Sequence, residues 1–263
     1  MSNGIDVCGP LGRDGYVLVP DVFGADQIES IGRAVQLQAA YLGGKGLPAL
    51  AADWRDQKFH TALISLREKN PSRVARIYDT LQTNSALRGA LLTPKVCSLV
   101  AEALSVDWSG LSATGEMLRM DFPGDTRNSL GWHQERSYYS QNRDGRNGLV
   151  LWAPLEDVGP STGGLGVCPG SHIKGWCPVD SSREEGQRTS EQFVVPETAL
   201  SEFEPIFLDA PAGSLVLFNM HLFHRSGQTL PNRVRLSVAV RFHKTLSEDF
   251  VPGNLTYVEV AGP

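Results

Sequence analysis

Near Trp108 the chain changes character, because helical patterns give way to short β-type runs. These runs are separated by Gly, Pro, Asn and Asp, and no helical pattern lies between them. Several short strands at this spacing favour an antiparallel sandwich, a jelly roll or a barrel. The predicted strands cover residues 111–121, 130–135, 147–156, 164–168, 204–208, 213–218, 221–225 and 234–243.

The first 105 residues have mostly helical patterns, at 25–40, 58–68, 72–83 and 94–104. The first helix should end at Gly43-Gly44, and Thr93 with Pro94 should begin the last one. A short apolar strand is predicted earlier, between Asp14-Gly15 and Pro20. Because an antiparallel sheet needs one face covered, we expect the helices to pack on one sheet. The 263 residues are therefore predicted to form one domain, 1–263, with a helix-rich part at about 1–105 and a jelly-roll core at about 106–263.

The strand predicted at 234–243 alternates strictly between apolar and polar positions. Its apolar face belongs to the core. Its other face carries Arg235 and Arg241, which must face water or a polar cavity. A guanidinium inside a barrel is tolerated only where an anionic group meets it.

Composition limits the partners of the chain. Net charge is −5, from 24 Lys+Arg against 29 Asp+Glu, so neither nucleic acid nor an anionic membrane is the expected partner. No apolar run approaches 18 residues and the first residues show no basic-then-apolar pattern, so neither a transmembrane span nor a secretory signal is expected. The four cysteines form no C-x-x-C pair and are expected to be reduced, which predicts a cytoplasmic location.

His133-Gln134-Glu135 is the first candidate for metal chemistry. On a strand, residues i and i+2 project from the same face, so an imidazole and a carboxylate could both reach one metal ion. A solvated His near a Glu in a loop is about equally common, so the pair needs further support.

His221-Leu222-Phe223-His224 supplies that support, because it follows another predicted strand. Positions three apart on a strand face opposite ways, so only one of the two histidines should join the site. Two imidazoles and one carboxylate form the platform typical of non-haem Fe(II) oxygenases. Zinc hydrolases also use two His and a Glu, but their helical H-E-x-x-H signature is absent here.

Arg235 follows His224 by eleven residues, on the polar face described above. A guanidinium offers a rigid two-pronged donor to a carboxylate. Beside an Fe(II) site the natural carboxylate is the distal one of 2-oxoglutarate. A surface salt bridge is the commoner fate of an arginine, but the combined spacings favour the cosubstrate.

With these residues the sequence resembles the phytanoyl-CoA dioxygenase (PhyH-like) family of Fe(II)/2-oxoglutarate-dependent oxygenases. The similarity covers most of the chain. The matching motifs are Asp14 to Asp21, Met117-Leu118, Phe122-Pro123-Gly124, His133-Gln134-Glu135, Trp152, Gly163-Gly164-Leu165, Pro169 to His172, His224 to Gly227, Asn232 and Arg235.

The resemblance implies a mainly β fold with flanking helices, a double-stranded β-helix (jelly roll, cupin-like) with helices packed on one sheet. It implies iron on His133, Glu135 and His224. It implies that 2-oxoglutarate, used together with O2, contacts Arg235 and Ser226, and also Trp152, Gln134 and Met117.

One departure from the family concerns Glu135, since the family usually has H-x-D and this chain has H-x-E. Glu still supplies a carboxylate, one methylene longer, so iron binding should survive. Related halogenases replace this carboxylate with Ala or Gly, so Glu135 argues against halogenation.

The resemblance implies an oxygenase that hydroxylates an unactivated C–H bond of a small molecule and releases succinate and CO2. Two alternatives stay open: desaturation, cyclisation or another oxidative rearrangement on the same platform, and a jelly roll that binds metal without turnover. Arg136, Tyr138 and His221 are weaker candidates for substrate contacts.

Overall fold

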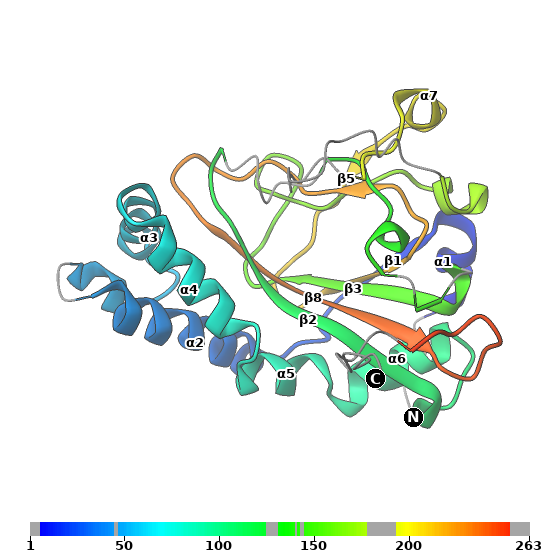
Figure 1. Ribbon diagram of the computed structural model, residues 1–263, viewed down its shortest axis with the longest axis horizontal. Helices are drawn as coiled ribbons and strands as arrows, with labels where there is room; N and C mark the ends of the chain where they lie inside the picture. Colours follow the sequence, from blue (N-terminus) through cyan, green and yellow to red (C-terminus); the bar gives the residue numbers. More distant parts are fainter. Residues whose placement is uncertain are drawn as a thin grey trace, which may run out of the picture.

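The protein is built around two facing antiparallel sheets, with helices on the outside of one of them (Figure 1). The computed structural model describes residues 6–44, 47–124, 131–139, 141–142, 145–177 and 193–252. The five-stranded sheet has the order β1-β6-β3-β8-β2, and the three-stranded sheet has the order β5-β4-β7. The strands are β1 (Tyr16–Val19), β2 (Leu111–Asp121), β3 (Gly148–Pro154), β4 (Gly166–Val167), β5 (Ile206–Phe207), β6 (Leu215–Asn219), β7 (His224–Arg225) and β8 (Arg235–Lys244). This arrangement confirms the predicted jelly roll with flanking helices.

One predicted strand is wrong. Residues 131–134 form no ladder: His133 alone makes isolated bridges, and the chain enters a 3₁₀ turn, η3 (Glu135–Ser137). Residue 130 lies outside the described residues. The apolar and polar pattern of this segment resembles that of a strand. Only His133, however, pairs with other segments, through single bridges to Val194 and His224.

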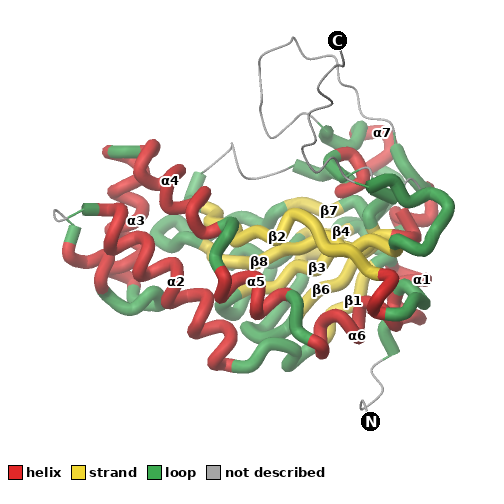
Figure 2. Tube along the Cα trace, turned by 60° about the horizontal axis from the view of Figure 1, so that its bottom comes forward, coloured by secondary structure: helices red, strands yellow, loops and turns green. Residues whose placement is uncertain are grey.

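The helices lie mostly in the first part of the chain, as predicted, and those that precede β2 cover one face of the five-stranded sheet (Figure 2). They are α1 (Cys8–Asp14), α2 (Ala25–Gly43), α3 (Gln57–Lys69), α4 (Pro71–Leu81), α5 (Ser85–Leu91), α6 (Pro94–Ala103) and the late α7 (Glu197–Leu200), with further 3₁₀ turns η1 (Pro48–Ala51), η2 (Trp108–Gly110), η4 (Gly145–Asn147) and η5 (Ser171–Lys174). Thr93 Oγ1 accepts a hydrogen bond from the Val96 N–H, so the predicted cap of α6 is confirmed. The short α1 and α5 were not predicted, because seven residues are too few to show helical periodicity.

The side chains of strand β8 alternate between the two faces of the five-stranded sheet. Leu236, Val238, Val240 and Phe242 pack against the helices, whereas Ala239 belongs to the apolar cluster between the two sheets. Arg235 and Arg241 are buried on that second side, which confirms the predicted alternation. Two charged side chains therefore lie in the interior between the sheets, which we call the lumen.

Gly32, in the middle of α2, lets this helix pack closely on Trp54. A Cβ at position 32 would lie 2.0 Å from the fully buried Trp54 ring. We expect Gly32→Ala to destabilise the protein by about 1–3 kcal/mol, because overpacking outweighs the better helix propensity of Ala. Gly89→Ala, exposed in α5 with nothing within 4 Å of a new Cβ, is the control and should stabilise by about 0.5–1 kcal/mol. Urea denaturation midpoints test both, and a stable Gly32→Ala would contradict the packing argument.

Within the described residues, no helix is both long enough and apolar enough to cross a bilayer.

Candidate active site

His133 and His224 lie directly opposite each other in the lumen. Each donates its backbone N–H to the carbonyl of the other, at 3.0 and 3.1 Å. Residues paired in this way project their side chains to the same side of the ladder, and the ring centroids are 4.1 Å apart. A single antiparallel bridge therefore brings together two imidazoles that are 91 residues apart in sequence.

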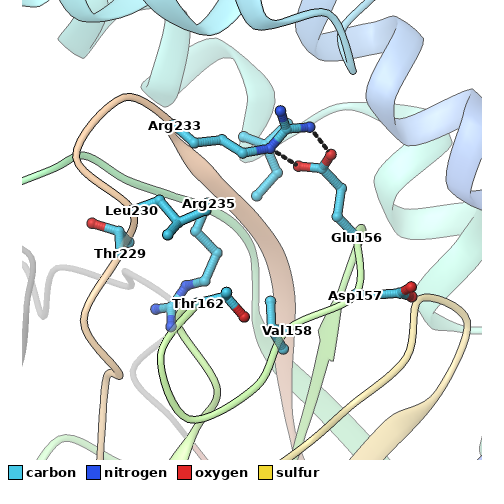
Figure 3. A pocket seen from close by; sticks show the side chains of 9 residues that line it. Glu156, Asp157, Val158, Thr162, Thr229, Leu230, Arg233 and Arg235 are labelled. Atoms are coloured by element: carbon cyan, nitrogen blue, oxygen red, sulfur yellow. Dashed lines mark hydrogen bonds and ion pairs between the residues drawn. The ribbon is translucent and has the colours of Figure 1, made fainter.

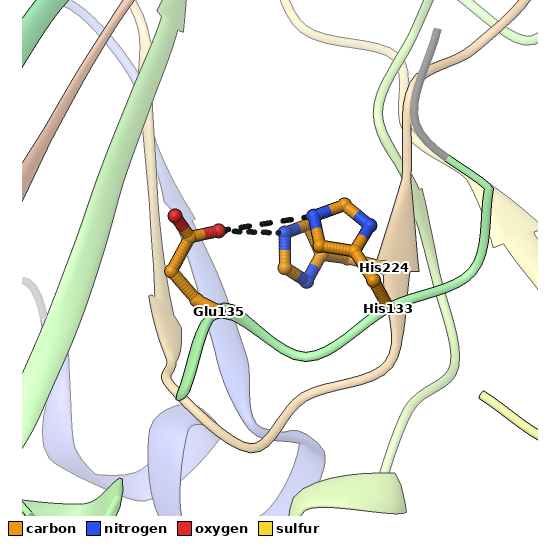
Figure 4. A group of neighbouring side chains, drawn as sticks. All are labelled: His133, Glu135 and His224. Atoms are coloured by element: carbon orange, nitrogen blue, oxygen red, sulfur yellow. Dashed lines mark ion pairs between the residues drawn. The ribbon is translucent and has the colours of Figure 1, made fainter. Parts of the chain in front are cut away.

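Glu135 completes the group from the start of η3 (Figure 4). Its Oε2 lies 3.2 Å from Nε2 of His224 and 3.8 Å from Nε2 of His133. All three side chains are buried, and their ligand atoms lie within 4.8 Å of one another. The predicted convergence of positions 133 and 135 is thus present, but a bridge followed by a turn produces it, not the shared face of a strand.

Both imidazoles are oriented for metal binding by their backbone surroundings. Nδ1 of His133 lies 2.7 Å from the Gly131 carbonyl, and Nδ1 of His224 lies 2.9 Å from the Leu222 carbonyl. Each Nδ1 therefore carries the proton, which leaves the Nε2 lone pair for a metal. Burial and the neighbouring His224 lower the pKa of His133 to about 3, so its ring is neutral. This donor set fits Fe(II).

Arg241 contacts the same carboxylate from the opposite side. Its Nε and a terminal nitrogen donate to Oε1 of Glu135 at 2.7 and 2.6 Å. Burial raises the pKa of the Glu135 carboxyl, but Arg241 and the two imidazoles outweigh it, so the pKa lies well below its ordinary value. Arg241 lies on the predicted polar face of its strand, but its residue type and spacing did not indicate this role.

Arg235 is also paired within the lumen. Its Nε and a terminal nitrogen donate to Oδ2 of Asp121 at 3.1 and 2.6 Å, and its other terminal nitrogen donates to the Gly163 carbonyl. Asp121 also accepts from Arg119 at 3.0 Å, through Oδ1. The anionic group expected beside Arg235 is therefore supplied in part by the chain itself, through a carboxylate that sequence analysis overlooked. Alternation of Arg119 and Asp121 with Leu118 and Met120 was the available signal.

Gly163 makes this position of Arg235 possible. Its φ is +101°, and a Cβ there would lie 2.9 Å from the side chain of Arg235. Gly163, one of the glycines in the motifs that match the family, thus allows the arginine to pass close to the backbone.

Comparison with known proteins identifies the family. The family model of phytanoyl-CoA dioxygenase (PhyH) matches residues 11–236. The chain belongs to the phytanoyl-CoA dioxygenase family. This membership confirms the predicted enzyme class, a non-haem iron dioxygenase that uses Fe(II) and 2-oxoglutarate. No curated protein sequence matches the chain.

Solved structures of similar fold include the epimerase SnoN, crystallised with Fe3+, alpha ketoglutarate and nogalamycin RO (TM-score 0.59, 15% identity, 90% of this chain and 82% of that chain). They also include the carbocyclase SnoK from nogalamycin biosynthesis (TM-score 0.58, 16% identity, 92% and 85%). EctD from S. alaskensis, with 2-oxoglutarate and 5-hydroxyectoine, is a third (TM-score 0.56, 16% identity, 93% and 80%). At these identities the likeness shows the shared fold.

The remaining predicted cosubstrate residues of this dioxygenase-family chain fall into two groups. Trp152 is buried in the lumen, with its ring centre 5.9 Å from the Arg235 guanidinium, and Met117 packs against the same apolar cluster. Ser226 is buried directly after β7. Gln134 differs, because its amide bonds the backbone of Gly175, Cys177 and His221. Gln134 therefore holds loops beside the site, where sequence analysis expected a contact with 2-oxoglutarate.

The three residues predicted to contact the substrate lie in different surroundings. The Tyr138 ring packs edge-on against His133, with centroids 5.6 Å apart, and remains 39% exposed. Burial raises its pKa to about 12, so the phenol is protonated. Arg136 lies in η3, half-buried. His221 lies in the turn between β6 and β7, outside the group of His133, Glu135 and His224. The histidine predicted to join the site, His224, is the one beside Glu135, although the regular strand assumed for that prediction is absent.

Two cavities lie beside the site, and no triad residue lines either. One of about 280 Å³ runs along Arg235, whose guanidinium points toward the loop of Thr162 while Arg233 pairs with Glu156 (Figure 3). The other, of about 660 Å³, is lined by His221 together with Cys8, Arg146, His172, Lys174 and Asn219. His221 therefore faces a separate space.

Proposed function

We propose that this chain is an oxygenase that uses Fe(II), 2-oxoglutarate and O2 to oxidise, most simply to hydroxylate, an unactivated C–H bond of a small-molecule substrate. The observation that carries the proposal is the buried group of His133, Glu135 and His224, in which both Nε2 atoms and one carboxylate oxygen face one point. Bound iron would supply the activation of O2 that is coupled to decarboxylation of 2-oxoglutarate into succinate and CO2.

The residues of the chain have distinct parts in this proposal. His133, Glu135 and His224 would hold the metal and supply two imidazole ligands and one carboxylate ligand. Arg235 and Ser226 bind the far carboxylate of 2-oxoglutarate, with Trp152 and Met117 as the apolar wall. Asp121 then keeps its hydrogen bond to Arg119 when Arg235 turns to the cosubstrate. Tyr138, next to His133, borders the substrate space.

A second outcome on the same platform is an oxidative rearrangement such as desaturation or ring closure. SnoN is described as an epimerase and SnoK as a carbocyclase, and both share this fold. Which outcome follows is set by how the substrate is placed relative to the metal.

Succinate release tests the proposed function. The purified Fe(II) protein, incubated in air with 2-oxoglutarate and a metabolite library, should release succinate with at least one substrate. An anaerobic sample and the His224→Ala variant should release none. Product masses then separate hydroxylation from loss of two hydrogens. Absence of succinate with all substrates, despite bound iron, would support the metal-binding jelly roll.

Chloride provides a further prediction. Because Glu135 occupies the position that halogenases leave open, the product formed in chloride buffer should carry no chlorine, as judged by its isotope pattern. A chlorinated product would contradict the role of Glu135 as a ligand.

A further inference from the structure

Arg241 contacts Glu135 on the side away from the histidines. Its side chain is 7% exposed, and two of its nitrogens donate to the same oxygen, Oε1. The other oxygen, Oε2, faces the two Nε2 atoms. The two oxygens of one carboxylate are therefore used by different partners.

Arg241 is itself fixed by two further contacts. Its remaining terminal nitrogen donates to the Gly115 carbonyl at 3.0 Å, and its guanidinium lies 4.7 Å from the centre of the Tyr139 ring. Gly115 has φ +61° and lies where the register of β2 shifts between Thr114 and Met117. A Cβ at Gly115 would lie 2.4 Å from the Tyr139 hydroxyl. The irregularity in β2 and the aromatic ring thus hold the guanidinium in one place.

Glu135 needs such a support more than an aspartate would. Its side chain has one more rotatable bond, and ordering a flexible side chain opposes metal binding. Hydrogen bonds to the outer oxygen of a ligating carboxylate fix its orientation.

We propose that Arg241 is a positioning residue that holds Glu135 through Oε1 and so presents Oε2 to the metal. The inference rests on the proposed function, since it assumes that Glu135 is a ligand. It also explains why this chain has H-x-E. An aspartate is shorter by one carbon–carbon bond, about 1.5 Å, and would reach either the metal or Arg241 but not both.

Affinity for Co(II) alone tests the proposal without turnover. The metal is titrated anaerobically into the purified full chain, and the visible Co(II) bands report both affinity and ligand geometry. We expect Arg241→Gln to bind about 10–100-fold more weakly than wild type, as is usual when the partner of a ligand is lost. Arg241→Lys, which keeps the charge but not the fork, should fall between them. Arg233→Gln removes an arginine–carboxylate pair outside the lumen. Its Co(II) affinity should stay within about threefold of wild type, a much smaller change than the loss expected for Arg241→Gln.

Glu135→Asp provides an independent variant that leaves Arg241 intact. It should weaken Co(II) binding by about tenfold or more, yet bind better than Glu135→Ala. In the Glu135→Asp background, Arg241→Gln should lower Co(II) affinity by less than about threefold, because the contact between residue 135 and Arg241 is already broken. A purely structural role for Arg241 would give the same loss in both backgrounds.

The outcomes separate the two proposals. Unchanged affinity in Arg241→Gln, tighter binding in that variant, or full affinity in Glu135→Asp would each overturn the positioning role. Tighter binding would show that Arg241 competes with the metal for Glu135. Failure of wild type to bind Co(II), or to release succinate with iron bound, would instead contradict the proposed function.

Discussion

His224→Ala is expected to abolish metal binding and turnover, whereas His221→Ala keeps both. The two histidines are three residues apart and both are buried. Of these two histidines, His224 is the one that belongs to the group with Glu135, with its Nε2 atom 3.2 Å from Oε2. His224 is a direct ligand in the proposed site. Its removal should therefore lower metal affinity by more than the roughly 10–100-fold that follows when the hydrogen-bond partner of a ligand is lost.

His221 is the matched control because its side chain faces elsewhere. It lies against Gly145 and borders the larger cavity, while its carbonyl accepts from Gln134. Alanine keeps that carbonyl, so the turn between β6 and β7 should persist. Co(II) titration and succinate release measure both variants. Loss of metal in His221→Ala with retention in His224→Ala would reverse the assignment.

Arg235→Ala is expected to weaken 2-oxoglutarate binding by roughly 30-fold to several thousand-fold. Loss of one partner of a desolvated charge pair costs about 2–5 kcal/mol, and about 1.4 kcal/mol corresponds to tenfold. Arg235 is 6% exposed, which places this pair in the desolvated class. Arg235→Lys keeps the charge without the fork and should lie between the alanine variant and wild type.

The measurement is titration of 2-oxoglutarate into the anaerobic Fe(II) protein, followed by the charge-transfer absorbance of the chelate. Metal affinity should persist in both variants, because no ligand has changed. Arg233→Ala, two residues earlier and paired with Glu156, controls for general damage to this end of β8. Unchanged affinity in Arg235→Ala would remove the cosubstrate assignment and favour a metal-binding protein without turnover.

Arg235→Ala should also lower the stability of the protein, because Arg235 pairs with the buried Asp121. Arg119 and Arg235 both donate to this buried carboxylate, and together they outweigh burial and lower its pKa. Among the residues that the structure describes, Arg235→Ala leaves Asp121 with Arg119 as its partner, so a lower melting temperature should accompany the weaker cosubstrate binding. Comparison at a temperature where all variants are folded separates the two effects.

Local sequence signals predicted most of the elements. Turn residues and apolar runs marked all eight strands of the described residues, and Thr93-Pro94 marked the start of α6, because each signal acts within a few residues. The segment before Glu135 was misjudged since its extended shape depends on single bridges to residues far along the chain, Val194 and His224. Short helices such as α5 were missed for lack of a full period.

The sequence by itself determined the residue types of the proposed ligands and the faces of β8. His133, Glu135, His224 and Arg235 are recognisable from residue type and spacing, and alternation places the arginines on the polar side of their strand. Only the tertiary structure decided which carboxylate pairs with each of the two arginines of β8. Arg235 meets Asp121 across 114 residues of sequence, and Arg241 meets Glu135 across 106. Periodicity states which face a side chain occupies, but its partner is set by the pairing of distant strands and turns, on which local sequence carries no information.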